Sequence, residues 1–168
     1  VIGTVDQECI VTWVLDQQHV DLSFSAKHMM VATVKGRFTD VQAELAIDEA
    51  HPEASRVRAV VAAASLTTGN ADRDAHLQSA DFLDVATHPT LTFESTRVRR
   101  VGDDRFELTG DLAIRGTTRP VVLTGEFSGP VSGPWGDRRI GFALAGEIDR
   151  EDFGLTWNVA LEIGRAHV

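Results

Sequence analysis

The sequence predicts an all-β fold, an antiparallel barrel with one short helical insert. First, apolar and polar residues alternate with period two over seven or eight segments, the pattern of strands that have one buried and one solvated face. Second, tight turns such as Gly102-Asp103-Asp104 join most of these segments. Third, the alternation is interrupted at length in one stretch, residues 65–95. Up-and-down strands close most simply into a barrel, which removes exposed edges. We expect eight strands, or seven visible strands and a missing closing strand.

Taken in order, residues 1–12 are expected to be a loose N-terminal arm and residues 13–168 a single domain. The buried face of the pattern changes between Phe38 and Val41, as at a bulge or bend. Residues 115–120 and 129–136 contain Gly and Pro and are expected to be a turn and a loop. A short first strand is suggested at 13–15, and the other strand-like segments lie at 22–25, 34–47, 56–67, 90–94, 106–114, 121–127, 140–148 and 155–161.

The interruption at residues 65–95 reads as a polar turn, a short helical insert over about residues 70–86, and a new strand. It combines charged and polar side chains with apolar bulk. We expect it to close one end of the barrel, with the apolar side chains facing inward and the polar ones at the rim. The inward set is Leu77, Phe82 and Leu83, and the rim set is Arg73, Asp74 and His76.

Composition excludes several classes of function. The chain of 168 residues has a formal net charge of −9, which argues against nucleic acid or an anionic lipid surface as a partner. Its one cysteine, Cys9, can form neither an intrachain disulfide nor a cysteine-based metal cluster. It contains no apolar run long enough to span a membrane. We expect a cytoplasmic protein, or a periplasmic or secreted one if a signal peptide preceded Val1.

The residues predicted to face inward differ greatly in size, from six phenylalanines to alanines and glycines such as Ala63, Gly110 and Gly125. The small residues could accommodate the phenylalanine rings, or they could leave a channel. A barrel of eight strands has roughly enough interior for one small ligand. Both a packed core and a cavity remain open at this point.

Four motifs follow one another along the chain. The opening motif, WVLDQQHVDLSFSAKHMMVATVKGRF, contains Trp13, Asp16, His19, Phe24, His28, Met29, Gly36 and Phe38. The insert contains Ser65, Thr68, Arg73, Asp74, His76, Leu77, Asp81, Phe82, Asp84, Val85, Pro89, Phe93 and Ser95. The last two motifs are GDLAIRGTTRPV and IDREDFGL. In this order the motifs resemble the YceI-like family of polyisoprenoid-binding proteins, which have a lipocalin-like barrel. The resemblance extends from residue 13 to about residue 163, and Val20 stands where the family usually has Ser.

The resemblance implies a barrel that holds a long isoprenoid tail, such as a polyprenyl phosphate or an isoprenoid quinone, without established catalytic chemistry. No cofactor other than such a bound lipid is expected. The family has a further closing strand after the turn near Gly164; an open seam would expose strand edges and favour a homodimer. The residues expected to line the ligand are Phe24, Met29, Met30, Phe38, Ala63, Leu77, Phe82, Leu83, Phe93, Leu112, Leu123, Phe142 and Trp157.

The polar candidates each have two interpretations. His28, Arg73 and His76 are the candidates for holding a polar head group, since Arg binds phosphate through paired hydrogen bonds. Alternatively, Arg73 and Asp74 cap the insert and attach it to the barrel rim. Asp16 and His19 are expected to form a turn that bonds its own backbone rather than a catalytic dyad. No metal site is predicted, because the spacing of the histidines matches no compact metal motif.

The leading hypothesis is therefore a non-enzymatic binder, carrier or store of a long apolar isoprenoid or other apolar lipid. One alternative is an enzyme acting on a small apolar substrate through His28, His76 and Asp74. It would require these side chains to converge inside the cavity at hydrogen-bond distance. A second alternative is a ligand-free interaction or stress-response module with a solid core.

Overall fold

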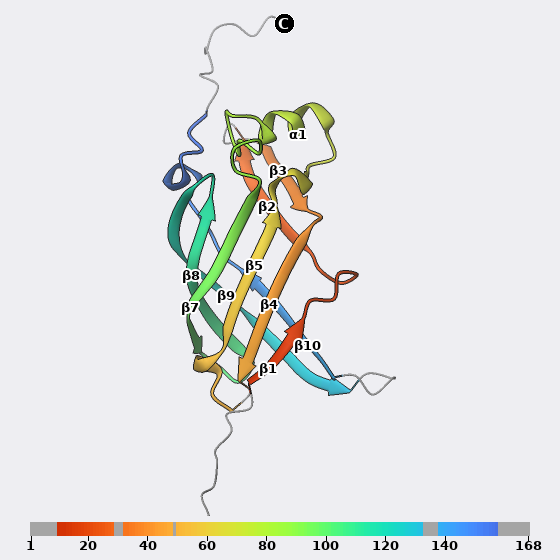
Figure 1. Ribbon diagram of the computed structural model, residues 1–168, viewed down its shortest axis with the longest axis vertical. Coiled ribbons are helices and arrows are strands. Elements are labelled where there is room, and N and C mark those ends of the chain that lie inside the picture. The colour runs from red at the N-terminus through yellow and green to blue at the C-terminus, as the bar shows by residue number, and fades with distance from the viewer. Residues whose placement is uncertain (1–9, 29–31, 49, 133–137, 158–168) are drawn as a thin grey trace, which may run out of the picture.

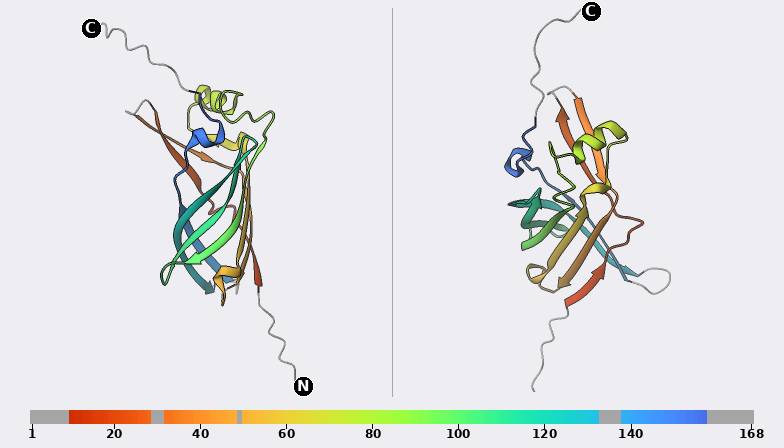
Figure 2. Two further views of the ribbon diagram at one scale, coloured as in Figure 1. Left: turned by 90° about the vertical axis from the view of Figure 1, so that its left-hand side faces the viewer. Right: turned by 45° about the horizontal axis from the view of Figure 1, so that its top comes forward.

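The computed structural model describes residues 10–28, 32–48, 50–132 and 138–157. Its strands curl into an elongated, incompletely closed barrel with the helical insert at one end (Figures 1 and 2). The end that carries the insert is called the insert end below, and the opposite end, where the β7–β8 turn lies, is called the mouth. The all-β antiparallel fold class is confirmed.

The wall of the barrel is one antiparallel sheet of seven strands, in the order β1-β4-β5-β7-β8-β9-β10. β1 and β10 are its two edges and are not paired with each other in the part of the chain that the structure describes. The sheet is thus curled but open along one seam. The strands are β1 (Ile10–Val14), β4 (Val41–Asp48), β5 (Arg56–Ala62), β7 (Thr90–Arg100), β8 (Arg105–Ile114), β9 (Thr117–Ser132) and β10 (Arg138–Ala145).

A second sheet of three strands lies at the insert end, formed by β2 (Leu22–His28), β3 (Ala32–Phe38) and β6 (Leu66–Thr67). The predicted bend between Phe38 and Val41 is where the chain passes from this small sheet to the large one. The single strand predicted for residues 56–67 is likewise divided, because the 3₁₀ turn η2 (Ala63–Ser65) separates β5 from β6. Period-two alternation indicates which face is buried but not which strand is the partner, so these two changes of sheet were not predicted.

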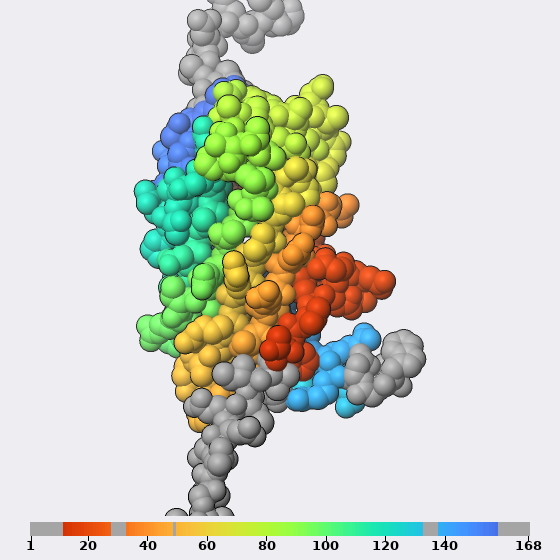
Figure 3. Space-filling model, in the orientation of Figure 1, coloured from red at the N-terminus to blue at the C-terminus, as the bar shows by residue number. Residues whose placement is uncertain are grey.

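The insert begins with α1 (Ala71–Gln78), which starts after Asn70. The Asn70 side chain accepts a hydrogen bond from the Arg73 N–H at 3.0 Å, the arrangement of an N-terminal cap. Residues 79–89 then fold back over the helix in turns, where the Leu83 N–H donates to the Leu77 carbonyl at 3.0 Å. In the space-filling view these residues cover the end of the barrel (Figure 3). The predicted insert is confirmed as a cap.

Below this cap the barrel has a packed core. Its fully buried residues come from β6, the insert, β8, β9 and the 3₁₀ turn η3 (Arg150–Phe153), with Phe153 only 2% exposed. Gly110 is necessary here because a Cβ at that position would collide with the ring of Phe93. The core residues are Leu66, Leu83, Ile114, Val121 and Phe153, with Phe24, Phe38, Leu77, Val85, Leu91, Phe93, Leu112 and Leu155 packed against them.

Several sequence-based boundaries were wrong. β1 begins at Ile10, inside the segment predicted as a loose arm, because Ile10 pairs with Asp48 and continues the edge of the sheet. β9 occupies 117–132 and therefore includes Pro120 and Pro130, which were predicted to lie in a turn and a loop. Residues 155–157 are not a strand; the rest of that predicted strand, residues 158–161, lies outside the described residues. Met29 and Met30 also lie outside them.

The turn between β8 and β9 is only two residues long. Arg115 and Gly116 both have positive φ, of 49° and 72°, as a tight hairpin turn of this twist requires. This is why Thr117 already pairs with Ile114. None of the helices within the described ranges is long and apolar enough to cross a bilayer.

Candidate functional site

The half of the barrel nearest the mouth contains a cavity of about 430 Å³. Side chains from β4, β5, β7, β8, β9 and β10 surround it, so it occupies the barrel interior below the packed core. The lining is mainly apolar, as expected for a ligand pocket that buries hydrocarbon. Its apolar residues are Leu45, Ile47, Pro52, Val57, Val98, Phe106, Leu108, Phe127, Pro130, Ile140, Phe142 and Leu144.

Strand alternation places these residues in the cavity. On β5, for example, Val57 points inward, whereas its neighbours Arg56 and Arg58 are exposed. Phe106 on β8 and Phe127 on the neighbouring strand β9 lie side by side, with ring centroids 5.8 Å apart in a T-shaped arrangement. Glycine does not create the cavity: a Cβ on Gly125 would collide with the backbone of Ala143, so this glycine allows β10 to approach β9 closely.

At the mouth, the cavity is bordered by polar groups. The lining there includes Arg100 at the end of β7, Asp103 and Asp104 in the β7–β8 turn, and Glu126 on β9. The Arg100 guanidinium donates through Nε to the Gly102 carbonyl at 2.9 Å and through Nη2 to the Asp103 carbonyl at 2.6 Å. Arg100 is therefore folded onto its own hairpin, with two of its donors already engaged.

The floor of the mouth is the 3₁₀ turn η1 (Pro52–Ala54) together with Ser55. The Asp48 side chain, 3% exposed, supports this turn: its Oδ1 accepts from the backbone N–H groups of Ala50 and His51 at 2.9 and 2.8 Å. The Asp48 N–H donates to Ser55 Oγ at 3.0 Å. The other carboxylate oxygen of Asp48 is buried without a hydrogen bond among the described residues, and His51 Nδ1 is 3.7 Å from it.

A second space of about 410 Å³ lies at the seam between β1 and β10. Trp13, Asp16, His19 and Arg139 are among the residues that line it, and Arg138 lies over the Trp13 ring at 5.6 Å from its centroid. It shares Leu45, Ile140 and Phe142 with the interior cavity, so the two spaces adjoin.

The predicted turn at Asp16 and His19 is present at the seam. Asp16 accepts hydrogen bonds from His19 Nδ1 at 2.9 Å and from the Gln18 N–H at 3.0 Å. Both hydrogen bonds hold the pKa of Asp16 below its ordinary value, and the bond with the His19 side chain contributes more than the bond from the Gln18 backbone. Both side chains are more than half exposed, at 55% for Asp16 and 73% for His19. They form a self-bonded surface turn.

Most residues predicted to line a ligand are at the opposite end from the cavity. Phe142 is the exception among those the structure describes, because it lines both spaces. Ala63 is buried beside the insert, and the side chain of Leu123 lies where a Cβ on Gly146 would collide with it. The residues that pack in the core are Phe24, Phe38, Leu77, Leu83, Phe93 and Leu112.

The predicted rim residues of the insert are engaged in holding it to the small sheet. Asp74 accepts hydrogen bonds from the N–H and Oγ1 of Thr68, at 2.8 and 2.5 Å, and from Thr67 Oγ1 at 3.1 Å. These bonds lower the pKa of Asp74, and the bond from the Thr68 side chain has the largest effect. Arg73 Nε donates to Thr68 Oγ1 at 2.7 Å. These are the contacts expected if the two residues pin the insert.

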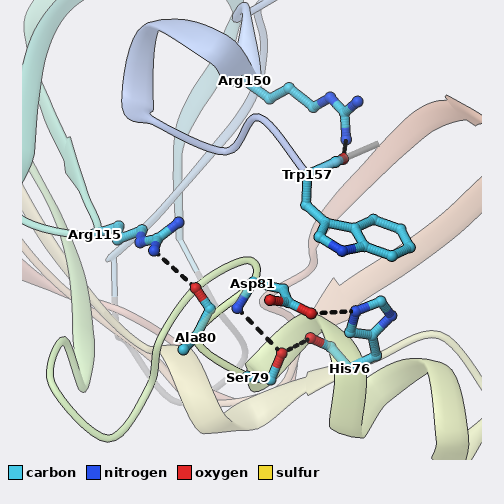
Figure 4. A network of polar contacts seen from close by, with 7 residues as sticks. All are labelled: His76, Ser79, Ala80, Asp81, Arg115, Arg150 and Trp157. Carbon is cyan, nitrogen blue, oxygen red and sulfur yellow. Dashed lines mark hydrogen bonds and ion pairs between the residues drawn. The ribbon is translucent and has the colours of Figure 1, made fainter. Parts of the chain in front are cut away.

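His76 belongs to a network at the insert end (Figure 4). Its Nε2 is 3.0 Å from Asp81 Oδ2, and its ring lies edge-on to Trp157 with centroids 4.4 Å apart. Phe82 packs on both rings, so it does not enter the core as predicted. Arg115 donates to the Ala80 carbonyl at 2.7 Å, which attaches the insert to the β8–β9 turn. The network therefore joins the insert to the β8–β9 turn and to Trp157.

The hypothesis of a catalytic cluster therefore finds no support in the geometry. His76 and Asp74 make separate contacts on the cap and line neither cavity. His28 ends β2 at the same end of the molecule. Within the described ranges, no group of three or more His, Cys, Asp or Glu residues could hold a metal ion.

Comparison with known proteins agrees with this architecture. The sequence model of the YceI-like domain matches residues 13–167. A UPF0312 protein of Azotobacter vinelandii is 41% identical over 145 residues, covering 85% of this chain and 76% of the relative. Protein YceI of Escherichia coli is 38% identical over 149 residues, covering 89% and 75%.

Two solved structures are similar to this fold. The YceI protein of Campylobacter jejuni superimposes with a TM-score of 0.69 at 35% identity, over 84% of this chain and 83% of that one. BcnA of Burkholderia cenocepacia gives a TM-score of 0.76 at 20% identity, over 85% and 86%, a likeness of fold alone. With its family motifs, its barrel and these relatives, the chain belongs to the YceI-like family.

Proposed function

We propose that this protein binds and carries a long apolar isoprenoid chain in the interior cavity, without transforming it chemically. The observation that carries the proposal is the apolar cavity of about 430 Å³ that lies inside the barrel and reaches the mouth. A hydrocarbon chain entering from the mouth would meet Phe106, Phe127 and Leu144 first and Leu45 and Leu108 further in.

Burial of hydrocarbon is sufficient to give useful affinity. Each CH₂ group removed from water contributes roughly 0.8 kcal/mol, and about ten such groups give a gross contribution of about 8 kcal/mol. Association itself costs several kcal/mol, so the net affinity increases with the length of chain that the cavity can hold. A purely apolar chain therefore needs little polar recognition.

The distribution of titratable groups favours a carrier over an enzyme. The titratable residues that line the interior cavity in the described chain are Arg100, Asp103, Asp104 and Glu126, all exposed at the mouth. No acid–base pair faces the apolar wall within the described residues. The cavity also argues against a solid, ligand-free core, although the insert end is packed in that way.

Native mass spectrometry of delipidated protein with a prenyl alcohol tests the proposal. We expect one ligand per chain, with affinity increasing as the prenyl chain lengthens up to the capacity of the cavity. A protein that takes up no prenyl alcohol of any length, and that carries no lipid when purified from cells, would refute it.

A further inference from the structure

We propose that the cavity selects amphiphiles whose polar end is uncharged, such as an alcohol or a quinone, over the same chains ending in phosphate or diphosphate. This inference rests on the proposed function, because it concerns the head group of the ligand that the cavity would hold.

The orientation of such a ligand follows from the packing. At its inner end the cavity meets the core beneath the insert, where Phe93 fills the space above Gly110 and Leu112 packs beside it. The wall between this core and the mouth is apolar on all the strands that line it. Because an unpaired polar group is costly to bury in such a wall, the polar end of the ligand lies at the mouth.

The mouth has an excess of negative charge. Among the residues that line the cavity there, Arg100 supplies one guanidinium, and Asp103, Asp104 and Glu126 supply three carboxylates. Arg100 uses Nε and Nη2 to hold the hairpin carbonyls, which limits what it can offer a ligand. Glu126 has Arg105 as a neighbour, with Nη2 3.5 Å from Oε1, but both side chains are more than 60% exposed, so their attraction is weak.

Asp48 adds a further negative charge beneath the mouth. It is almost completely buried, and Ser55, to which its N–H donates, lines the cavity. Two backbone N–H groups donate to one of its oxygens and partly balance its charge, and His51 Nδ1 is 3.7 Å from the other oxygen. A buried carboxylate acts through a medium of lower dielectric than water, so its effect on a neighbouring anion is less screened.

These charges discriminate between head groups. A diphosphate placed at the mouth would lose hydration and approach the carboxylates within about a Debye length of 8 Å. A hydroxyl or a quinone carbonyl meets no such repulsion and can accept a hydrogen bond from the remaining N–H groups of Arg100. The discrimination therefore arises mainly from rejection of the charged end.

The seam offers the other polar surface that an anionic end could reach. It carries Arg138, Arg139 and His19, but also the Asp16 carboxylate that bonds His19. A chain in the cavity would reach the seam past Leu45, Ile140 and Phe142, which line both spaces. Binding at the seam is thus the outcome that competes with the proposal.

The test compares geranylgeraniol with geranylgeranyl diphosphate, which share one hydrocarbon chain. We expect the alcohol to bind at least about tenfold more tightly at low salt, a difference of about 1.4 kcal/mol, and the ratio to decrease as salt screens the carboxylates. The double variant Asp103→Asn and Asp104→Asn should strengthen diphosphate binding several-fold. It should fold normally, because the hairpin is held by the backbone carbonyls of these residues, which both substitutions keep.

A matched control removes the same two charges elsewhere. Glu94 and Asp111 are paired neighbours on the outer face of β7 and β8, both exposed, and Glu94→Gln with Asp111→Asn should leave the ratio unchanged. Equal or tighter binding of the diphosphate would overturn the inference, as would diphosphate binding that Arg138→Gln abolishes. Failure of both compounds to bind would instead refute the proposed function.

Discussion

Substitution of Val57 by Phe should obstruct the interior cavity. Val57 lies on β5 and points into the cavity between the mouth and the core. The larger side chain displaces about four carbon-sized groups of a bound chain, at roughly 0.8 kcal/mol each. The expected loss is about 3 kcal/mol, which weakens prenyl alcohol binding by about two orders of magnitude.

The control for this prediction is Val122→Phe, the same chemical change on the outer face of β9, where Val122 is 48% exposed. Affinities are measured by displacement of an apolar fluorescent probe, and thermal unfolding establishes that both variants fold. The cavity offers room for the new ring at Val57, so a melting temperature close to that of the unsubstituted protein is expected. If Val57→Phe folds and binds as tightly as Val122→Phe, the chain does not occupy this cavity.

Three further predictions concern stability and assembly. Phe153→Ala removes the most buried core ring and should lower the unfolding free energy, measured by urea titration, by about 3–5 kcal/mol. The folded variant should keep its affinity for prenyl alcohol, because the cavity lies at the other end of the barrel. A comparable loss of affinity in the folded variant would contradict the separation of core and cavity. Hydrogen bonds to its carboxylate depress the pKa of Asp74, so the stabilisation that Asp74 gives is complete above its ordinary pKa and is lost as pH falls through the depressed value. The unfolding free energy, measured between about pH 2 and pH 6, should therefore depend less on pH in Asp74→Asn than in the unsubstituted protein. An identical pH dependence would exclude this role. Within the described residues, the outer edges of β1 and β10 pair with no other strand, an arrangement that favours a homodimer. Light scattering should therefore show association that increases with concentration and decreases in Val14→Lys, whose position is 90% exposed on β1; a monomer at all concentrations would exclude the dimer.

The fold was predictable where alternation alone determines it. On β8, every second residue from Phe106 to Ile114 is inward, as the pattern indicated. The pattern did not indicate where the chain changes sheet, because Phe38 and Leu66 pair across a distance in sequence that no local signal reports. It also treated Pro120 as a turn residue, whereas Pro120 lies in β9, opposite Asp111.

The pattern of inward residues left open whether the interior is packed or hollow, and it did not locate the cavity. Phe93 and Phe106 are both inward phenylalanines on strands, and their sequence environments look alike. In the structure Phe93 packs in the core above Gly110, whereas Phe106 lines the open cavity. The difference depends on which end of the barrel the insert covers. None of the four family motifs includes the β7–β8 turn, and the Gly102-Asp103-Asp104 sequence indicates only a hairpin there.

The roles of the polar candidates were also not evident from the sequence. Arg73, Asp74 and His76 were adjacent in sequence and of the types that hold anions. Their partners, Thr68 and Asp81, are equally close in sequence and hold these side chains on the insert. Arg100 at the mouth gave no motif signal, since a single arginine at a strand end is common. Its proximity to Asp103 and Asp104 within a hairpin was the one clue available.

The most direct measurement of the central claim is a crystal structure of the protein with a bound prenyl alcohol. We expect continuous electron density along the barrel interior from Leu108 to the mouth, with the hydroxyl near Arg100 and the core beneath the insert unchanged. An interior that contains only water, or a ligand bound against the insert beside His76, would contradict the account.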